Sequence, residues 1–160
     1  MIWLALCLIV LPFAFVLLYG APYLPTRREQ AEQALDMLGL KEGEVFVDLG
    51  CGDGALLVAA ARRGLRCYGY ELNPFVWAVA VWRTRKVRDL VTVRCKNFWK
   101  ITLSPETKGV FVFLLDKYMP KLDAKLSKEL KKGSQLVSYT FQIPNKKPKA
   151  VQGALYLYKY

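Results

Sequence analysis

A short apolar strand followed by three alternating glycines is the feature that most constrains the fold of this 160-residue chain. Residues 45–54 read VFVDLGCGDG, and an apolar run follows over residues 55–61. Glycine tolerates φ > 0 and carries no Cβ, so a glycine-rich turn between a strand and a helix lets a ligand approach the backbone. The start of the following helix also offers unpaired N–H groups. The pattern predicts a ligand-binding strand–turn–helix unit.

Two nucleotide-type interpretations fit this glycine loop. Gly50, Gly52 and Ala55 match the dinucleotide pattern G-x-G-x-x-G/A, and Glu71 lies at about the 20-residue distance expected for a ribose-binding acid. With Asp48 included, the loop reads D-x-G-x-G-x-G, which resembles the first motif of class I S-adenosylmethionine-dependent methyltransferases. We favour the methyltransferase, because a dehydrogenase normally needs a second domain for its substrate.

A second carboxylate is expected beside the loop. Residues 66–71 read as a strand that ends in Glu71, and Asn73 then precedes Pro74 in the order typical of an N-cap and a first helical position. Consecutive strands of a βαβ unit are neighbours, so Glu71 should end next to the glycine loop. There its carboxylate can accept hydrogen bonds from both ribose hydroxyls of a cofactor. The alternative is a charge that only favours the helix dipole.

The rest of the chain alternates between strand and helix patterns, which predicts an α/β fold with a Rossmann-like, doubly wound and mostly parallel sheet. We expect strands at residues 45–48, 66–71, 90–94, 109–115, 135–141 and 154–160, and helices at residues 28–40, 54–63, 74–86 and 118–131. Residues 97–108 are too rich in turn formers for a full helix. Residues 143–152 are expected to form a basic loop that only one strand follows, which indicates a reduced C-terminal hairpin.

The N-terminal residues 2–19 contain no charged residue. A helix over residues 2–20 would be about 29 Å long, close to the roughly 30 Å of a bilayer's hydrocarbon core. We interpret residues 1–22 as an uncleaved transmembrane anchor and residues 23–160 as the methyltransferase domain. The alternative, a cleaved signal peptide, would have a basic segment before its apolar core. Arg27 and Arg28 place the domain on the cytoplasmic side by the positive-inside rule.

The net charge of +11 lies outside the uncharged N-terminal segment, so anionic lipid headgroups are an expected partner. Lysines recur along one face of the helix expected near residues 118–131, at Lys117, Lys121, Lys125, Lys128 and Lys132. Each lysine near an anionic surface could contribute about 1 kcal/mol, although an ordinary solvated helix face explains the same pattern. No nucleic-acid-binding motif accompanies the charge, so no nucleic-acid partner is expected.

Two residue types limit the chemistry of the chain. Histidine is absent, which excludes Ser–His and Cys–His nucleophile pairs. The four cysteines are widely spaced and form no C-x-x-C motif, so neither a metal site nor a redox pair is indicated. No catalytic base can be named from these residues.

Four short segments extend the resemblance beyond the glycine loop. They are YLPT at residues 23–26, VDLGCGDG at 47–54, YELNP at 70–74 and NFWK at 97–100. Together with the N-terminal apolar segment, they make the chain resemble the small membrane-anchored lysine methyltransferases. Mitochondrial members of that family modify the ATP synthase c subunit and the adenine nucleotide translocase. The resemblance extends from about residue 23 to the C-terminus.

The resemblance implies that the cofactor is S-adenosylmethionine and that its binding residues are Thr26, Asp48, Gly50, Cys51, Gly52, Glu71 and Asn97. Thr26 would close over the methionine end, Asp48 and the loop would cradle the amino acid part, and Glu71 would bind the ribose. Asn97 stands where the family usually has an aspartate that contacts the adenine amino group. Its amide oxygen can still accept that hydrogen bond.

We therefore expect a membrane-anchored methyltransferase that N-methylates a lysine of a membrane protein, with its catalytic domain in the cytoplasm. Such a transfer depends mainly on alignment and on a dry pocket that lowers the pKa of the lysine amine. Because the apolar segment begins at residue two, we expect a prokaryotic cell membrane, with the mitochondrial inner membrane as the alternative. Other interpretations are a methyltransferase acting on a lipid or quinone, and a non-catalytic docking module that retains the cofactor fold.

Overall fold

The computed structural model describes residues 28–160. The anchor expected at residues 1–22 and the expected cofactor residue Thr26 lie outside the described residues. Among residues 28–160, none of the helices combines the length and the apolar character that crossing a bilayer requires.

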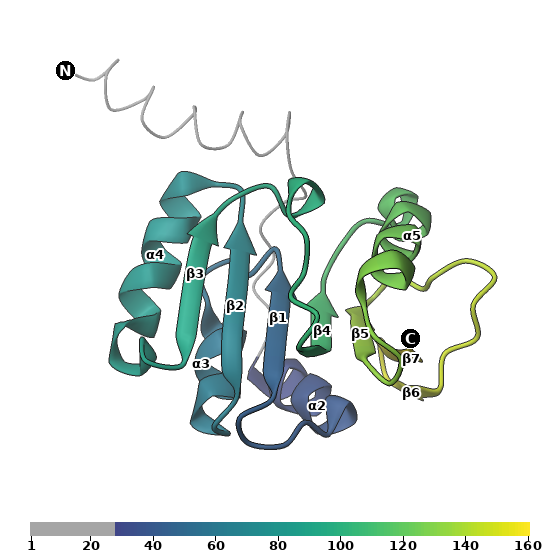
Figure 1. The fold of residues 1–160 in the computed structure, drawn as a ribbon, viewed down its shortest axis with the longest axis horizontal. Helices are drawn as coiled ribbons and strands as arrows, with labels where there is room; N and C mark the ends of the chain where they lie inside the picture. Colours follow the sequence, from purple (N-terminus) through teal and green to yellow (C-terminus); the bar gives the residue numbers. More distant parts are fainter. Residues whose placement is uncertain (1–27) are drawn as a thin grey trace, which may run out of the picture.

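A seven-stranded mixed sheet forms the centre of the described chain, in the order β3-β2-β1-β4-β5-β7-β6. Its strands are β1 (Val45–Leu49), β2 (Arg66–Glu71), β3 (Val91–Cys95), β4 (Thr107–Val112), β5 (Gln135–Tyr139), β6 (Ala150–Gln152) and β7 (Leu155–Lys159). Strands β1 to β5 pair in parallel, whereas β7 pairs antiparallel with both β5 and β6. The carboxyl ends of β1, β2 and β3 therefore meet at one edge of the sheet (Figure 1).

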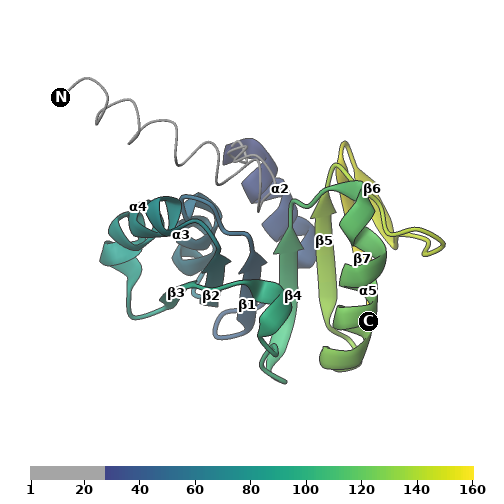
Figure 2. The same ribbon diagram turned by 90° about the horizontal axis from the view of Figure 1, so that it is seen from above.

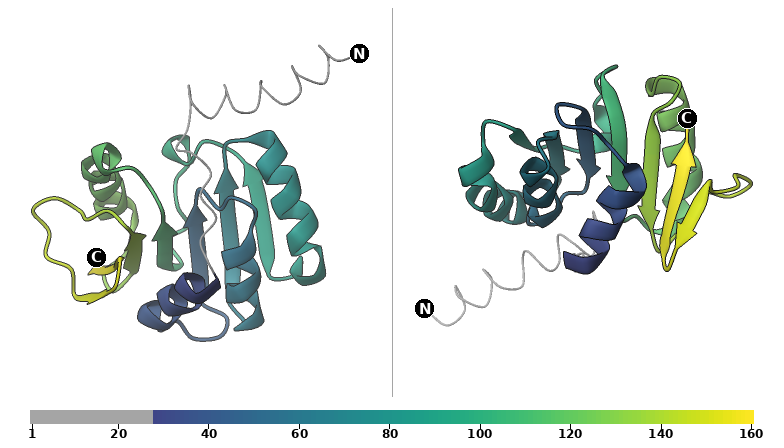
Figure 3. Two further views of the ribbon diagram at one scale, coloured as in Figure 1. Left: turned by 180° about the vertical axis from the view of Figure 1, so that it is seen from behind. Right: turned by 90° about the horizontal axis from the view of Figure 1, so that it is seen from below.

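Helices cover both faces of this sheet. They are α2 (Arg28–Leu38), α3 (Ala55–Arg62), α4 (Pro74–Thr84) and α5 (Met119–Glu129), with short 3₁₀ turns η1 (Arg85–Val87), η2 (Phe98–Lys100) and η3 (Asp116–Tyr118). Helices α2, α3 and α4 lie on one side of the sheet (Figure 2). Helix α5 lies beside β5 (Figure 3) and packs on the opposite face.

The alternation of side chains along β1 divides the core into two layers. Phe46 packs with the apolar residues of α2 and α3, whereas its neighbour Val47 belongs to the layer that contains Met119 and Leu122 of α5. Successive strand residues point to opposite faces, so a strand covered on both sides is apolar without interruption. Burial of all five residues of β1 fixes the strand whose end carries the glycine loop.

The predicted order and type of the strands and helices are confirmed, with ends that shift by a few residues. The exception is the C-terminal hairpin. Residues 150–152, expected as part of a basic loop, form β6 and pair antiparallel with β7 through a turn at Gly153, which has φ 57°. The hairpin therefore has two strands instead of the one predicted. All three residues of β6 are exposed, so no apolar alternation marks this strand in the sequence.

Some of the lysines expected to face lipid on or near α5 make contacts within the domain. Lys125 is largely buried, and its Nζ donates to Glu129 Oε1 at 2.7 Å and to the Ile101 carbonyl. Lys121 Nζ lies 4.6 Å from the centroid of the Trp99 ring. Lys117 Nζ lies 4.9 Å from the centroid of the Tyr118 ring. Three of the five lysines in the predicted stripe thus make contacts within the domain, and of these three Lys125 is the one whose charge is paired and largely buried.

Candidate cofactor site

The glycine loop, residues 50–54, makes a tight turn at the carboxyl end of β1. The N–H groups of Gly50 and Cys51 donate to the Tyr70 carbonyl oxygen at 2.9 and 3.0 Å, which attaches the loop to β2. Gly50 has φ 90°, and a Cβ placed there would meet no described atom within 4 Å. Glycine is required at this position for its backbone conformation. The space beside it is open among the described residues.

The far end of the loop is held against α4. A Cβ at Gly54 would lie 3.2 Å from the side chains of both Ala80 and Thr84, so α4 approaches the loop closely. Asp53 Oδ1 accepts a hydrogen bond from Ala55 N at 3.1 Å, and its Oδ2 pairs with Arg83 Nη2 at 2.9 Å. Neither Asp53 nor Arg83 is among the residues predicted for the site. The one sequence signal for the contact between the loop and α4 was the acidic residue within the glycine motif.

Glu71 lies at the end of β2 and joins two segments of the site. Its Oε2 accepts a hydrogen bond from Gly52 N at 3.0 Å, and its Oε1 accepts one from Asn73 N at 2.8 Å. The Asn73 side chain in turn accepts from the N–H groups of Phe75 and Val76, which confirms the predicted N-cap of α4. Each Glu71 oxygen retains a lone pair for a ligand.

Asp48 is buried at the end of β1, with 3% of its surface exposed. Within residues 28–160, its carboxylate takes part in no hydrogen bond, and burial raises its pKa to about 8. The negative charges of Glu71 and then Asp53 are the smaller contributions to this rise. Charged groups that are both buried and surrounded by like charges favour a cationic partner, which would lower this pKa again. Within residues 28–160, these acids do not form a group that could hold a metal ion.

The other two predicted residues within the described chain have more limited roles. The Cys51 thiol packs inward, because a Cβ at Gly69 of β2 would lie 2.8 Å from its Sγ. Burial raises the pKa of this thiol, so it is held as a neutral packing group. Asn97 follows β3, and its Oδ1 accepts a hydrogen bond from Trp99 N at 2.9 Å as the cap of η2. One lone pair of this oxygen remains for an adenine amino group.

The structure brings together the ends of three neighbouring strands. Glu71 pairs in register with Cys95 at the end of β3, and Lys96 N donates to the Glu71 carbonyl oxygen at 3.0 Å. Asp48, the glycine loop, Glu71 and Asn97 therefore share the carboxyl edge of the sheet, where open α/β folds bind ligands. An acidic, partly buried edge next to an open glycine turn fits a cationic nucleoside such as S-adenosylmethionine.

A protein-family model matches most of the chain, including the glycine loop and the ends of β2 and β3. The model of the ANTKMT methyltransferase domain matches residues 48–150.

Curated proteins match over a wider range of the chain. The Homo sapiens lysine N-methyltransferase named for the ATP synthase c subunit is 35% identical over 136 residues, which cover 82% of this chain and 57% of that protein. The adenine nucleotide translocase lysine N-methyltransferase of Mus musculus is 38% identical, over 82% of this chain and 58% of its own length. This chain thus spans less than two thirds of these two relatives.

A relative of similar size also matches, and so do solved structures. A protein-lysine N-methyltransferase of Saccharolobus islandicus is 32% identical over 81% of this chain and 83% of its own length. An RNA methyltransferase from Salinibacter ruber, solved in complex with S-adenosyl-L-homocysteine, superposes with a TM-score of 0.79 at 26% identity, over 85% of this chain and 93% of that one. The architecture is thus the S-adenosylmethionine-binding methyltransferase fold.

Proposed function

Because this chain belongs to the ANTKMT methyltransferase domain family, we propose that it is an S-adenosylmethionine-dependent protein-lysine N-methyltransferase that acts at a membrane. The observation that carries the proposal is the similarity to the protein-lysine N-methyltransferase of S. islandicus, which extends over 83% of that protein. The relatives named for the ATP synthase c subunit and the adenine nucleotide translocase support a lysine of a membrane protein as the substrate.

We assign cofactor binding to the carboxyl edge of β1, β2 and β3. When bound, S-adenosylmethionine supplies an electrophilic methyl group on a sulfonium ion. The buried Asp48 carboxylate would neutralise the cationic amino acid end, and Glu71 would accept the ribose hydroxyls through its remaining lone pairs. Asn97 would bind the adenine amino group, and Thr26 would close over the methionine end.

The residues of this chain would then align a lysine amine with the methyl group and exclude water from the pocket. A lysine must arrive neutral to act as a nucleophile, and desolvation lowers the pKa of its amine. The chain contains no histidine, and this route needs no histidine base. We name no catalytic residue.

The membrane part of the proposal is supported by the sequence. Residues 2–19 are uncharged and are followed by Arg27 and Arg28, a pattern that favours an anchor with the domain on the cytoplasmic side. A target lysine close to the membrane surface would then be within reach of the site.

Mass spectrometry of cells that produce the full chain, the Asp48→Asn variant or no enzyme tests this function. We expect methylated lysine in a membrane protein with the wild-type chain and a loss of at least about tenfold with Asp48→Asn, because the variant lacks the carboxylate buried at the site. Asp36→Asn is the matched control, since Asp36 on α2 forms an exposed ion pair with Arg63. Methylation confined to a lipid, a quinone or RNA would overturn the proposed substrate.

A further inference from the structure

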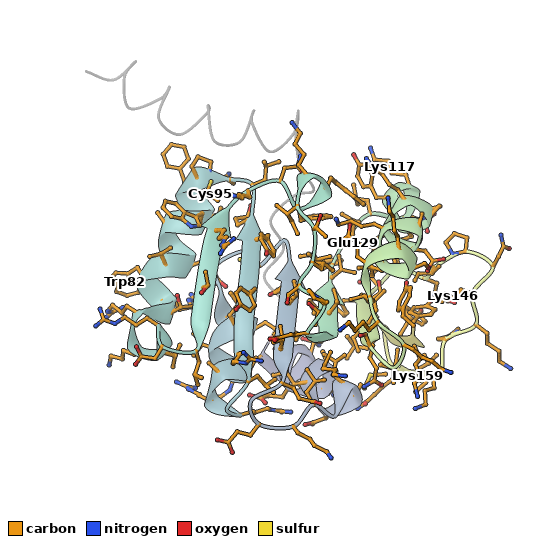
Figure 4. The ribbon with its side chains drawn as sticks, viewed as in Figure 1. Trp82, Cys95, Lys117, Glu129, Lys146 and Lys159 are labelled. Carbon is orange, nitrogen blue, oxygen red and sulfur yellow. The ribbon has the colours of Figure 1, made fainter. Side chains whose placement is uncertain are left out.

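Helix α4 buries its small residues and exposes its large ones. Ala80 and Thr84 face the domain and are buried, whereas Phe75, Val79 and Trp82 are 62%, 46% and 64% exposed. The three exposed residues are four and three positions apart, so they lie on one face of the helix. Figure 4 shows Trp82 on the outer side of α4, away from the strands. This arrangement is the reverse of an ordinary helix on a protein surface.

Basic residues gather at the C-terminal end of the same helix. The Arg85 guanidinium lies 4.2 Å from the centroid of the Trp82 ring, and its Nη1 donates to the Trp82 carbonyl oxygen at 2.7 Å. Lys86 and Arg88 follow and are exposed, and in the part of the chain that the structure describes they form no ion pair. An aromatic and apolar stripe that ends in free cations is typical of helices that lie in a membrane interface.

We propose that the α4 surface, defined as Phe75, Val79, Trp82, Arg85 and Lys86, docks onto the anionic lipid surface of a membrane. The apolar side chains enter the boundary between headgroups and acyl chains, and the cations contact lipid phosphates. Cations near an anionic surface add electrostatic attraction to the burial of the apolar side chains.

Charge complementarity favours lipid over the other occupants. A second copy of this chain would bring another molecule with a net charge of +11 to a cationic surface. The chain's own residues 1–26 contain no aspartate or glutamate that could pair with Arg85 or Lys86. Anionic lipid supplies both the apolar layer and the negative charge that the α4 surface requires.

Docking through α4 would orient the cofactor site. The helix is capped by Asn73, whose N–H is bound by the same Glu71 carboxylate that holds the glycine loop. A bilayer in contact with α4 would therefore run along this helix, whose first turn lies beside the carboxyl edge of β2 and whose basic end leads toward the start of β3. This consequence rests on the proposed function, because it concerns how a lysine of a membrane protein reaches the site. The lipid contact itself does not depend on it.

Fluorescence quenching by brominated lipid tests the contact in the full chain. The protein is reconstituted into phosphatidylcholine vesicles that contain about 30% phosphatidylglycerol, with bromine on the upper part of the acyl chains. The difference between wild type and Trp82→Phe isolates the emission of Trp82. We expect this emission to be quenched, and we expect quenching to fall by at least about twofold in Val79→Glu and in vesicles of phosphatidylcholine alone.

Val151→Glu is the matched control. Val151 is also an exposed valine, at 56%, but it lies on β6 at the opposite edge of the sheet, so its substitution should leave the quenching unchanged. Trp82 emission that brominated anionic vesicles do not quench would overturn the proposal. So would Trp82 emission that shows the same burial from water in detergent micelles without lipid as in the vesicles. Methyl-lysine measured in cells that produce the same variants separates the two claims: methylation without quenching contradicts only the docking, and quenching without methylation contradicts only the enzymatic function.

Discussion

Two regions of the domain differ in whether their buried ionisable groups are paired. At the carboxyl edge of β1 to β3, Asp48 takes part in no hydrogen bond within residues 28–160 and has a pKa raised to about 8. Around α5 and β7, the half-buried charged groups are paired: Lys125 with Glu129, and Lys146 with Asp123, which also accepts from the Tyr160 hydroxyl.

Figure 4 labels Glu129 and Lys146 on this second half of the molecule. Charged groups that are paired inside the domain stabilise the fold, whereas a buried carboxyl group without a hydrogen-bonding partner among residues 28–160 indicates a place for a ligand. We therefore propose that the β1–β3 part of this domain is its binding half and that the part around α5 and β7 is its structural half, and the following variants test that separation.

The largest expected effect comes from adding a side chain at Gly69, which packs tightly beneath the glycine loop. A Cβ at Gly69 would lie 2.4 Å from Leu57 Cδ1 and 2.8 Å from Cys51 Sγ. Gly69→Val should therefore lower the free energy of unfolding by about 3 kcal/mol and abolish cofactor binding. Urea denaturation and calorimetric titration measure the two effects.

Gly153→Ala in the C-terminal hairpin is the contrasting variant. No described atom lies within 4 Å of a Cβ there, and only the positive φ of 57° opposes the change. We expect a loss of about 1 kcal/mol in unfolding free energy and an unchanged cofactor affinity. An equal loss of affinity in both variants would contradict the assignment of binding to β1–β3.

Two carboxylates that accept backbone N–H groups give a sharper comparison. Glu71 holds Gly52 and Asn73 in the binding half, and Glu129 accepts from Leu103 N at 2.9 Å in the structural half. Glu71→Ala should weaken S-adenosylmethionine binding by about 1.5–3 kcal/mol through the loss of charge-assisted hydrogen bonds. Glu129→Ala should reduce stability without changing the affinity for S-adenosylmethionine. Titrations in which Glu129→Ala weakens binding and Glu71→Ala does not would contradict the distinction between the two halves.

The last comparison concerns pH. Burial raises the pKa of Asp48 from 3.8 to about 8, so the ligand-free protein should lose stability as the pH rises from about 4 to about 8. A cationic cofactor favours the charged carboxylate and releases a proton on binding. Affinity should therefore rise by up to about tenfold per pH unit below this pKa. Calorimetry of Asp48→Asn should show a flat profile between about pH 6 and 8; a slope equal to wild type would exclude Asp48 as its source.

Local sequence signals were enough to predict where the residues of the candidate site lie. The glycine spacing, Asp48 before it and the Asn73–Pro74 pair each depend on neighbours in the chain, and parallel pairing brings Glu71 beside the loop. Contacts between distant segments could not be predicted in the same way. The bond from Gly52 N to Glu71 depends on the final loop conformation.

The same reason accounts for the differences elsewhere. Strand β6 has three exposed residues and forms only because β7 is available to pair with it. The use of Lys125 as a packing residue depends on the Ile101 carbonyl, which reaches α5 from a different loop. Nothing in the periodicity of α4 indicates which of its faces is buried, because the residues on the buried face are small.

Calorimetric titration of the full chain in detergent micelles tests the central claim, that the edge of β1–β3 binds S-adenosylmethionine through Asp48 and Glu71. Titrations at pH 7 in buffers of different ionisation enthalpy report both affinity and proton release. We predict one binding site, release of a proton in the wild type and none in Asp48→Asn, and weaker binding in Glu71→Ala. Tighter binding of NAD than of S-adenosylmethionine, or an affinity that neither substitution changes, would contradict the account.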